Sequence, residues 1–117
     1  MNKKQYKEIE AQVPTIINYT KEVKIIEAFF EKSALKIEET TEIFWNHVLT
    51  LFERIDEGEQ NEYDMSEVDE MSIEAREMTE KFEVFVGQER AFSLTDFERY
   101  LVSLYFEQLI KGADDNE

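Results

Sequence analysis

Apolar residues recur every three or four positions along most of this chain, a spacing that places them on one side of a helix. A first, charged segment at residues 2–13 shows the pattern only loosely and is interrupted by Pro14. The pattern is clear in four longer stretches, which we predict to be helices: residues 15–31, 38–57, 66–86 and 93–111. The sequence therefore predicts an all-α chain with four or five helices.

Glycines and polar residues mark the expected ends of the last three helices. Gly58, Gly87 and Gly112 stand where each of these helices should end, as glycine commonly does just past a helix C-terminus. Ser93 is a suitable N-cap for the last helix, and Asp96 stands three residues later, as in a capping box. These start and stop signals agree with the periodicity.

The helix predicted at residues 38–57 carries the side chains of most chemical interest. Seven residues form its apolar side: Ile43, Phe44, His47, Val48, Leu51, Phe52 and Ile55. Trp45 lies about 100° around the helix from Phe44, off the centre of that side. We therefore expect Trp45 to lie at an interface with a partner protein.

The composition fits a single helical domain. The 117 residues include three glycines and one proline, whereas sandwiches and barrels need many Gly and Pro turns. We divide the chain into a helical segment at residues 1–14, a helical domain at residues 15–111 and an acidic tail at residues 112–117. We expect the tail to be disordered.

The charge limits the partners that the chain can bind. The formal net charge of −15 repels phosphate backbones and disfavours anionic membranes, so we expect no direct binding to nucleic acid and none to membranes. No run of 18 apolar residues and no signal-peptide pattern is present, and we expect a cytoplasmic protein. The absence of cysteine excludes disulfides and thiol catalysis.

The residue pattern offers little support for a metal site or an enzyme. No stretch has the alternating Asp/Asn ligands and central Gly of a calcium-binding EF-hand loop, and no Gly-rich phosphate loop is present. A di-iron site would need Glu-x-x-His pairs on two helices, but Phe44 stands three residues before His47, the only histidine. We expect no catalytic residues, no cofactor and no metal.

His47 has two interpretations that the residues alone leave open. It could be a satisfied, partly buried histidine at a contact between helices. It could also be a regulated site, because Arg54 follows seven residues later on the same helical face and could hold a phosphate placed near the imidazole. An ion pair between Arg54 and a neighbouring Glu is the structural alternative for the arginine.

The segment at residues 46–58 resembles the first signature of PRD domains. These are the phosphotransferase-system regulation domains of bacterial antiterminators and transcriptional activators. Their signature has a D-H-[IV] start, an Arg seven residues after the His and often a Gly four residues after that. This chain has Asn46 in place of the Asp, and then His47, Arg54 and Gly58 at the same spacing.

A second segment, at residues 94–106, is similar to the stretch that opens the last helix of PRD domains. Glu98 and Leu104 match this signature. Tyr105 stands where family members have a second histidine that can be phosphorylated. Together the two segments extend the resemblance over about residues 16–110, which is nearly the whole chain.

The resemblance implies a compact five-helix bundle of PRD type that forms a homodimer. It also implies that a phosphocarrier or sugar phosphotransferase protein transfers a phosphoryl group to His47, with Asn46, Arg54, Glu98 and Tyr105 around it. Tyr105 should then lie near His47, where its hydroxyl could orient the imidazole, a role for which Asn46 is poorer than the usual Asp.

On this interpretation the chain is a stand-alone regulatory domain that acts in transcription regulation through another regulator. One alternative is a purely structural helical interaction module without phosphorylation. A second is a small metal-binding or enzymatic helical bundle.

Overall fold

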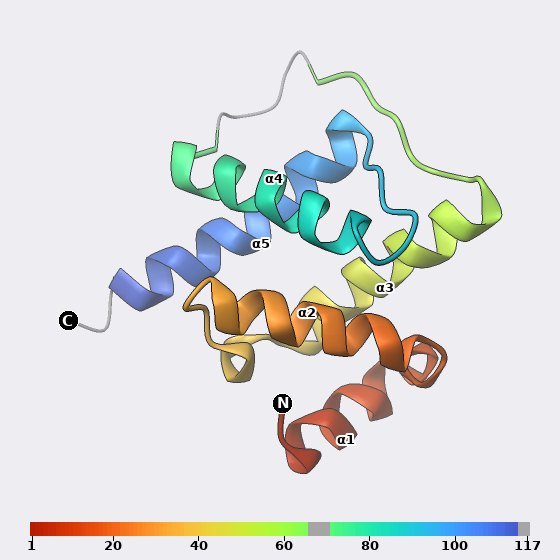
Figure 1. Cartoon of the computed structure of the whole chain (residues 1–117), viewed down its shortest axis with the longest axis vertical. Helices are drawn as coiled ribbons and strands as arrows, with labels where there is room; N and C mark the ends of the chain where they lie inside the picture. The colour runs from red at the N-terminus through yellow and green to blue at the C-terminus, as the bar shows by residue number, and fades with distance from the viewer. Residues whose placement is uncertain (66–70, 115–117) are drawn as a thin grey trace. The chain divides into compact units, whose positions relative to one another are not determined.

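The computed structural model describes residues 1–65 and 71–114, with side chains as far as Lys111, and within these ranges it contains five α-helices and no strand (Figure 1). The predicted all-α class is therefore confirmed. Contacts between residues divide the chain into two compact units, Met1–Thr50 and Leu51–Glu117. None of the helices in the described residues combines the length and the apolar character that a membrane-spanning helix requires.

The first unit begins with α1 (Lys3–Gln12), which Asn2 caps by accepting a 2.8 Å hydrogen bond from the Gln5 backbone N–H. The next helix was expected from residue 15, but residues Pro14–Tyr19 form a 3-10 helix, η1. The α-helix α2 starts only at Thr20 and ends at Lys32. Tyr19 has φ −127° and ψ 35°, so a continuous α-helix cannot pass through it.

A short 3-10 helix, η2 (Ile37–Glu39), separates α2 from α3 (Glu42–Glu57). The core of the first unit consists of large side chains from α1, η1, α2 and α3: Ile9, Val13, Ile16, Val23, Ile25, Ile26, Phe29, Phe30, Phe44, Trp45, Val48 and Leu49. Aromatic rings pack edge to face within it, since the Phe44 ring centroid lies 5.7 Å from that of Phe30 and 5.4 Å from that of Trp45.

The apolar side of α3 differs from the prediction. Trp45, expected at a partner interface, is fully buried, and its Nε1 donates a 2.8 Å hydrogen bond to the Thr40 hydroxyl. Ile43, expected to face inward, is 61 % exposed. The buried face is rotated toward Trp45 and Leu49, because burying the largest side chain removes the most apolar area from water.

The C-terminus of α3 confirms the role predicted for Gly58. Gly58 has a left-handed φ of 71°, its N–H donates to the Ile55 carbonyl at 3.2 Å, and the Glu59 N–H donates to the Arg54 carbonyl at 2.8 Å. These two bonds define a Schellman motif. The same motif ends α2, but there Ala34 occupies the left-handed position with a φ of 57°.

The second unit contains α4 (Ile73–Gly87) and α5 (Asp96–Asp114), which pack against each other (Figure 1). The start expected for α4, at residue 66, lies outside the described residues. Residue 72 is not helical, and its hydroxyl accepts a hydrogen bond from the Ala75 N–H at 3.1 Å, so the helix begins at Ile73. The helix ends at Gly87, one residue after its predicted last residue, so Gly87 lies inside the helix and not just past it.

Both ends of α5 correct the prediction. The helix starts at Asp96 rather than at Ser93, and it continues through Gly112 as far as Asp114. A glycine inside a helix costs about 1 kcal/mol relative to alanine, which weakens a helix without breaking it. The last residues of the expected disordered tail, 115–117, lie outside the described residues.

Candidate functional site

The five residues predicted to surround a phosphoryl group divide between the two units. Asn46 and His47 belong to the first unit, whereas Arg54, Glu98 and Tyr105 belong to the second. The expected contact between Tyr105 and His47 joins residues of different units and stays a prediction.

His47 lies half-buried on α3, and its Nε2 atom is buried. The preceding residue, Asn46, has an exposed side chain, and its carbonyl accepts a 2.7 Å hydrogen bond from the Thr50 hydroxyl. Side chains of adjacent helical residues do not face each other. The helix therefore does not direct the Asn46 amide toward the His47 ring, as an orienting group would require.

Arg54 is on the same helix, about 10 Å further along its axis, because seven residues each rise 1.5 Å. Its side chain is half-buried, and its Nη1 donates a 3.2 Å hydrogen bond to the Asn61 side-chain oxygen. No residue that the structure describes forms an ion pair with Arg54, so the Glu partner considered from the sequence is not found there. The guanidinium is held by a neutral amide.

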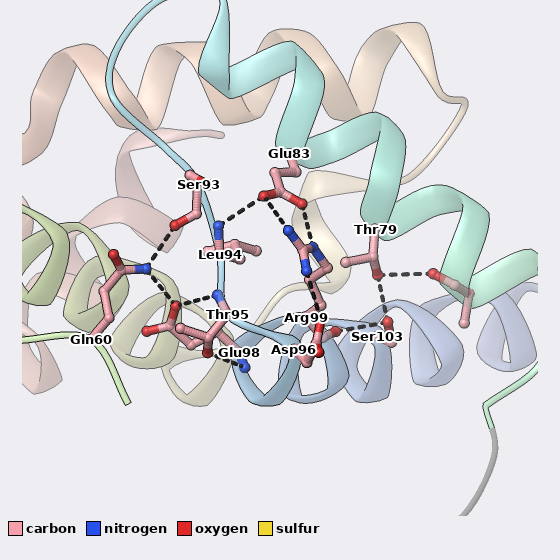
Figure 2. Close-up of polar contacts among 11 residues, drawn as sticks. Gln60, Thr79, Glu83, Ser93, Leu94, Thr95, Asp96, Glu98, Arg99 and Ser103 are labelled. Atoms are coloured by element: carbon pink, nitrogen blue, oxygen red, sulfur yellow. Dashed lines mark hydrogen bonds and ion pairs between the residues drawn. The ribbon is translucent and has the colours of Figure 1, made fainter. Parts of the chain in front are cut away.

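Glu98 lies at the centre of a hydrogen-bonded cluster at the start of α5 (Figure 2). Its side chain is buried, with a residue exposure of 1 %, and its Oε1 accepts hydrogen bonds from the Thr95 N–H at 3.0 Å and from Gln60 Nε2 at 2.8 Å. Gln60 Nε2 also donates to the Ser93 carbonyl at 2.7 Å. Glu98 therefore fastens the loop after α3 to the first turn of α5.

The cluster contains the real capping box of α5. The Glu98 N–H donates to the Thr95 hydroxyl oxygen at 3.2 Å while the Glu98 carboxylate accepts from the Thr95 N–H, which is the reciprocal pattern of a capping box. The predicted pair, Ser93 and Asp96, is wrong because α5 starts at Asp96, so Thr95 and not Ser93 is the N-cap residue and Glu98 stands three residues after it. The match of Glu98 to the PRD signature thus has a structural explanation.

Two other members of this cluster were missed from the sequence. Gln60 and Asn61 lie in the polar loop after α3, and the Asn61 carbonyl accepts a 2.6 Å hydrogen bond from the Thr95 hydroxyl. The T-x-x-E sequence from Thr95 to Glu98 matches the capping-box pattern and could have predicted the box. No pattern in the sequence pointed to the two loop residues.

A second polar cluster connects α4 with α5 (Figure 2). The Arg99 guanidinium binds the Glu83 carboxylate through two hydrogen bonds, Nε to Oε1 at 2.7 Å and Nη2 to Oε2 at 3.2 Å, and Glu83 Oε2 also accepts from the Leu94 N–H at 2.8 Å. Hydrogen bonding to Glu83 raises the pKa of Arg99. Nearby, the hydroxyls of Thr79 and Ser103 are hydrogen-bonded at 2.8 Å. These contacts hold two helices together.

Tyr105 lies half-buried on α5, seven residues after Glu98. The two side chains therefore project from the same face of this helix, two turns apart.

An open hollow of about 410 Å³ is lined by residues before α4 and at the start of α5: Glu62, Tyr63, Asp64, Met65, Asp96 and Phe97. Within the described ranges, no group of three or more His, Asp or Glu side chains is placed to hold a metal ion, so we assign none to this hollow.

Comparison with models of known protein families, with curated proteins and with solved structures gives no match for this chain. The resemblance to PRD domains therefore rests on the residues of the two segments at 46–58 and 94–106.

Proposed function

We propose that this chain is a PRD-like regulatory domain that works by binding other proteins, and that it influences transcription through another regulator. The order of the two signature segments supports this function, because α3 carries the first segment and α5 the second. The proposal does not assign catalysis to the chain. It assigns the regulated step to phosphoryl transfer from a phosphocarrier or sugar phosphotransferase protein to His47.

The burial of the His47 Nε2 atom is the observation on which the switch depends. A phosphoryl group adds about two negative charges, and such a charge cannot remain in a buried position without strong pairing. Phosphorylation at this nitrogen would therefore force the ring toward water and disturb the packing of α3. A change of this kind at a helical surface can alter which partner is bound.

Arg54 is suited to stabilise the phosphorylated state. Its guanidinium is bound to the neutral Asn61 amide, and a phosphate dianion is a much stronger partner for a guanidinium. Exchanging Asn61 for phosphate would free the loop that Asn61 and Gln60 attach to α5. The modification at α3 would in this way reach the start of α5.

The buried Nε2 atom also favours a second candidate function, a structural helical interaction module without phosphorylation. In that case His47 has a structural role and no regulatory one, and the chain binds its partners constitutively. The two functions differ in whether a donor protein can reach the imidazole.

Incubation of the purified chain with the general phosphotransferase proteins and phosphoenolpyruvate distinguishes the two functions. We expect intact-mass spectrometry to detect one acid-labile phosphate on the native chain and none on His47→Gln. We expect Arg54→Gln to be labelled more slowly, and Lys36→Gln, which removes an exposed positive charge elsewhere, to be labelled at the native rate. A native chain that stays unlabelled under conditions that label a control phosphocarrier would support the structural function.

A further inference from the structure

The outer face of α4 carries two exposed apolar side chains at its two ends. Ile73 is 62 % exposed and Val84 is 63 % exposed. They are eleven residues apart, which is close to three helical turns, so both project from the same side about 16 Å from each other. The opposite side of α4 is buried through Ala75, Thr79, Phe82 and Val86.

Four charged residues lie nearest to the line that joins these apolar ends, and the exposed Glu74 lies further round the helix. Arg76, Glu77, Glu80 and Lys81 are all exposed, and none of their side chains has a hydrogen bond or ion pair with any residue in the described ranges. Two positive and two negative charges balance each other along this line. The unit around it is strongly acidic, since residues 51–117 contain six basic and twenty acidic side chains.

We propose that this face of α4 binds the same face of α4 in a second copy of the chain, with the two helices antiparallel. If the two-fold axis passes beside the middle of α4, Ile73 of each copy faces Val84 of the other. Glu77 then lies next to Lys81 of the other copy, and Arg76 lies next to Glu80. The face is thus complementary to itself, and every favourable pair occurs twice, as in an isologous interface.

The charge pattern favours a second copy over an unrelated partner. An acidic partner would be repelled by Glu77 and Glu80, and a basic one by Arg76 and Lys81, whereas the antiparallel copy pairs all four. A single pair of helices buries less than the roughly 1,200–2,000 Å² of a typical stable interface. We therefore expect a weak dimer, formed at micromolar concentrations or above, and its existence does not depend on phosphorylation of His47.

Cysteine cross-linking tests the register, because the native chain has no cysteine. We expect an oxidised mixture of the I73C and V84C variants to yield a covalent dimer that contains one chain of each. Neither variant alone should do so, since equal positions lie about 16 Å apart in the antiparallel pair and a disulfide needs Cα atoms within about 7 Å. Cross-linking of I73C with itself, or none in the mixture, would overturn the proposal.

A charge exchange tests the ion pairs by sedimentation equilibrium. Glu77→Lys places two lysines together and should weaken the dimer roughly tenfold, and adding Lys81→Glu should restore it. Glu89→Lys is the matched control, because it reverses the same charge at an exposed position beyond α4 and so lowers general repulsion equally. A native chain that stays monomeric into the millimolar range, or a Glu77→Lys dimer as strong as that of Glu89→Lys, would also refute the proposal.

Discussion

The two units of the chain carry very different charge. Residues 1–50 contain seven lysines, no arginine and eight glutamates, which gives a net charge of −1. Residues 51–117 contain four arginines, two lysines and twenty acidic residues, a net charge of −14. Nearly all of the acidity of the protein therefore belongs to the second unit.

The buried polar side chains of the two units also differ in their chemistry. In the first unit the Thr40 hydroxyl accepts from Trp45 Nε1 at 2.8 Å and donates to the Ile37 carbonyl at 2.6 Å, and Gln5 Nε2 donates to the same carbonyl at 2.9 Å. In the second unit the carboxylates of Glu98 and Glu83 take the corresponding place. The buried cluster around Thr40 is made of neutral groups, although the first unit also has an ion pair between the Met1 ammonium and the Glu27 carboxylate. The corresponding clusters of the second unit are built on Glu side chains, so the two units should respond differently to substitution and to salt.

Among the substitutions that test this contrast, Glu98→Ala should reduce the stability of the protein most. It removes the acceptor of the Thr95 N–H and of Gln60 Nε2 from a buried position, and we expect the free energy of unfolding to fall by about 2–4 kcal/mol. Urea denaturation followed by circular dichroism measures this loss. Glu89→Ala, at an exposed position, should change it by less than about 0.5 kcal/mol.

The corresponding change in the first unit is Thr40→Val, which keeps the shape of the side chain and removes its hydroxyl. The Trp45 indole N–H would then be buried without an acceptor, and we expect a loss of about 1–3 kcal/mol. Fluorescence of Trp45, the only tryptophan, follows the unfolding of this unit. Thr15→Val, an exposed threonine of the same unit, should be close to neutral, and an equal loss there would contradict the explanation.

Periodicity was sufficient to predict the helices, because the spacing of apolar residues determines which element can bury them. It did not locate Trp45 correctly, since a helix with large apolar residues around more than half of its circumference has several possible inward faces. It also could not place the break at Tyr19, which depends on the backbone conformation of one residue.

The candidate site was less predictable than the fold. The sequence identified Glu98 through a resemblance, whereas the structure gives it a capping role that follows from its position three residues after the N-cap Thr95. Gln60 and Asn61 were not predicted, because they lie in a loop and no periodicity there indicates which side chain turns inward. The proximity of His47 to Tyr105 depends on how the two units meet and stays a prediction.

The C-termini of α2 and α3 offer a matched pair of smaller changes, one in each unit. Ala34 and Gly58 occupy the same position of the same motif, with φ values of 57° and 71°. Because a left-handed backbone costs a residue with a Cβ about 1 kcal/mol, we expect Ala34→Gly to stabilise the protein by up to about that amount and Gly58→Ala to destabilise it similarly.

Thermal or urea denaturation of these two variants measures both shifts. A Cβ at Gly58 would meet no atom within 4 Å, so steric collision cannot explain a loss there. Shifts of the same sign in both variants would show that backbone strain does not control these helix ends.

Salt should have the smallest effect and should separate the units most directly. Raising the ionic strength from about 0.01 M to about 1 M shortens the screening length from roughly 30 Å to roughly 3 Å. Repulsion within the unit of net charge −14 would then be largely screened, whereas the unit of net charge −1 has little to lose. We expect amide hydrogen exchange to show greater protection for residues 73–111, by about 0.5–1 kcal/mol relative to residues 3–50.

The first unit serves as an internal reference, because any general effect of salt on apolar burial acts on both. Screening also weakens the attractions of the ion pairs in this unit, which join Arg99 to Glu83 and Asp96, Arg90 to Asp56, and Lys111 to Glu107. These attractions are outnumbered by the repulsions among its twenty acidic residues. Equal gains in both units, or a loss confined to the second, would show that its carboxylates are already neutralised by local pairing.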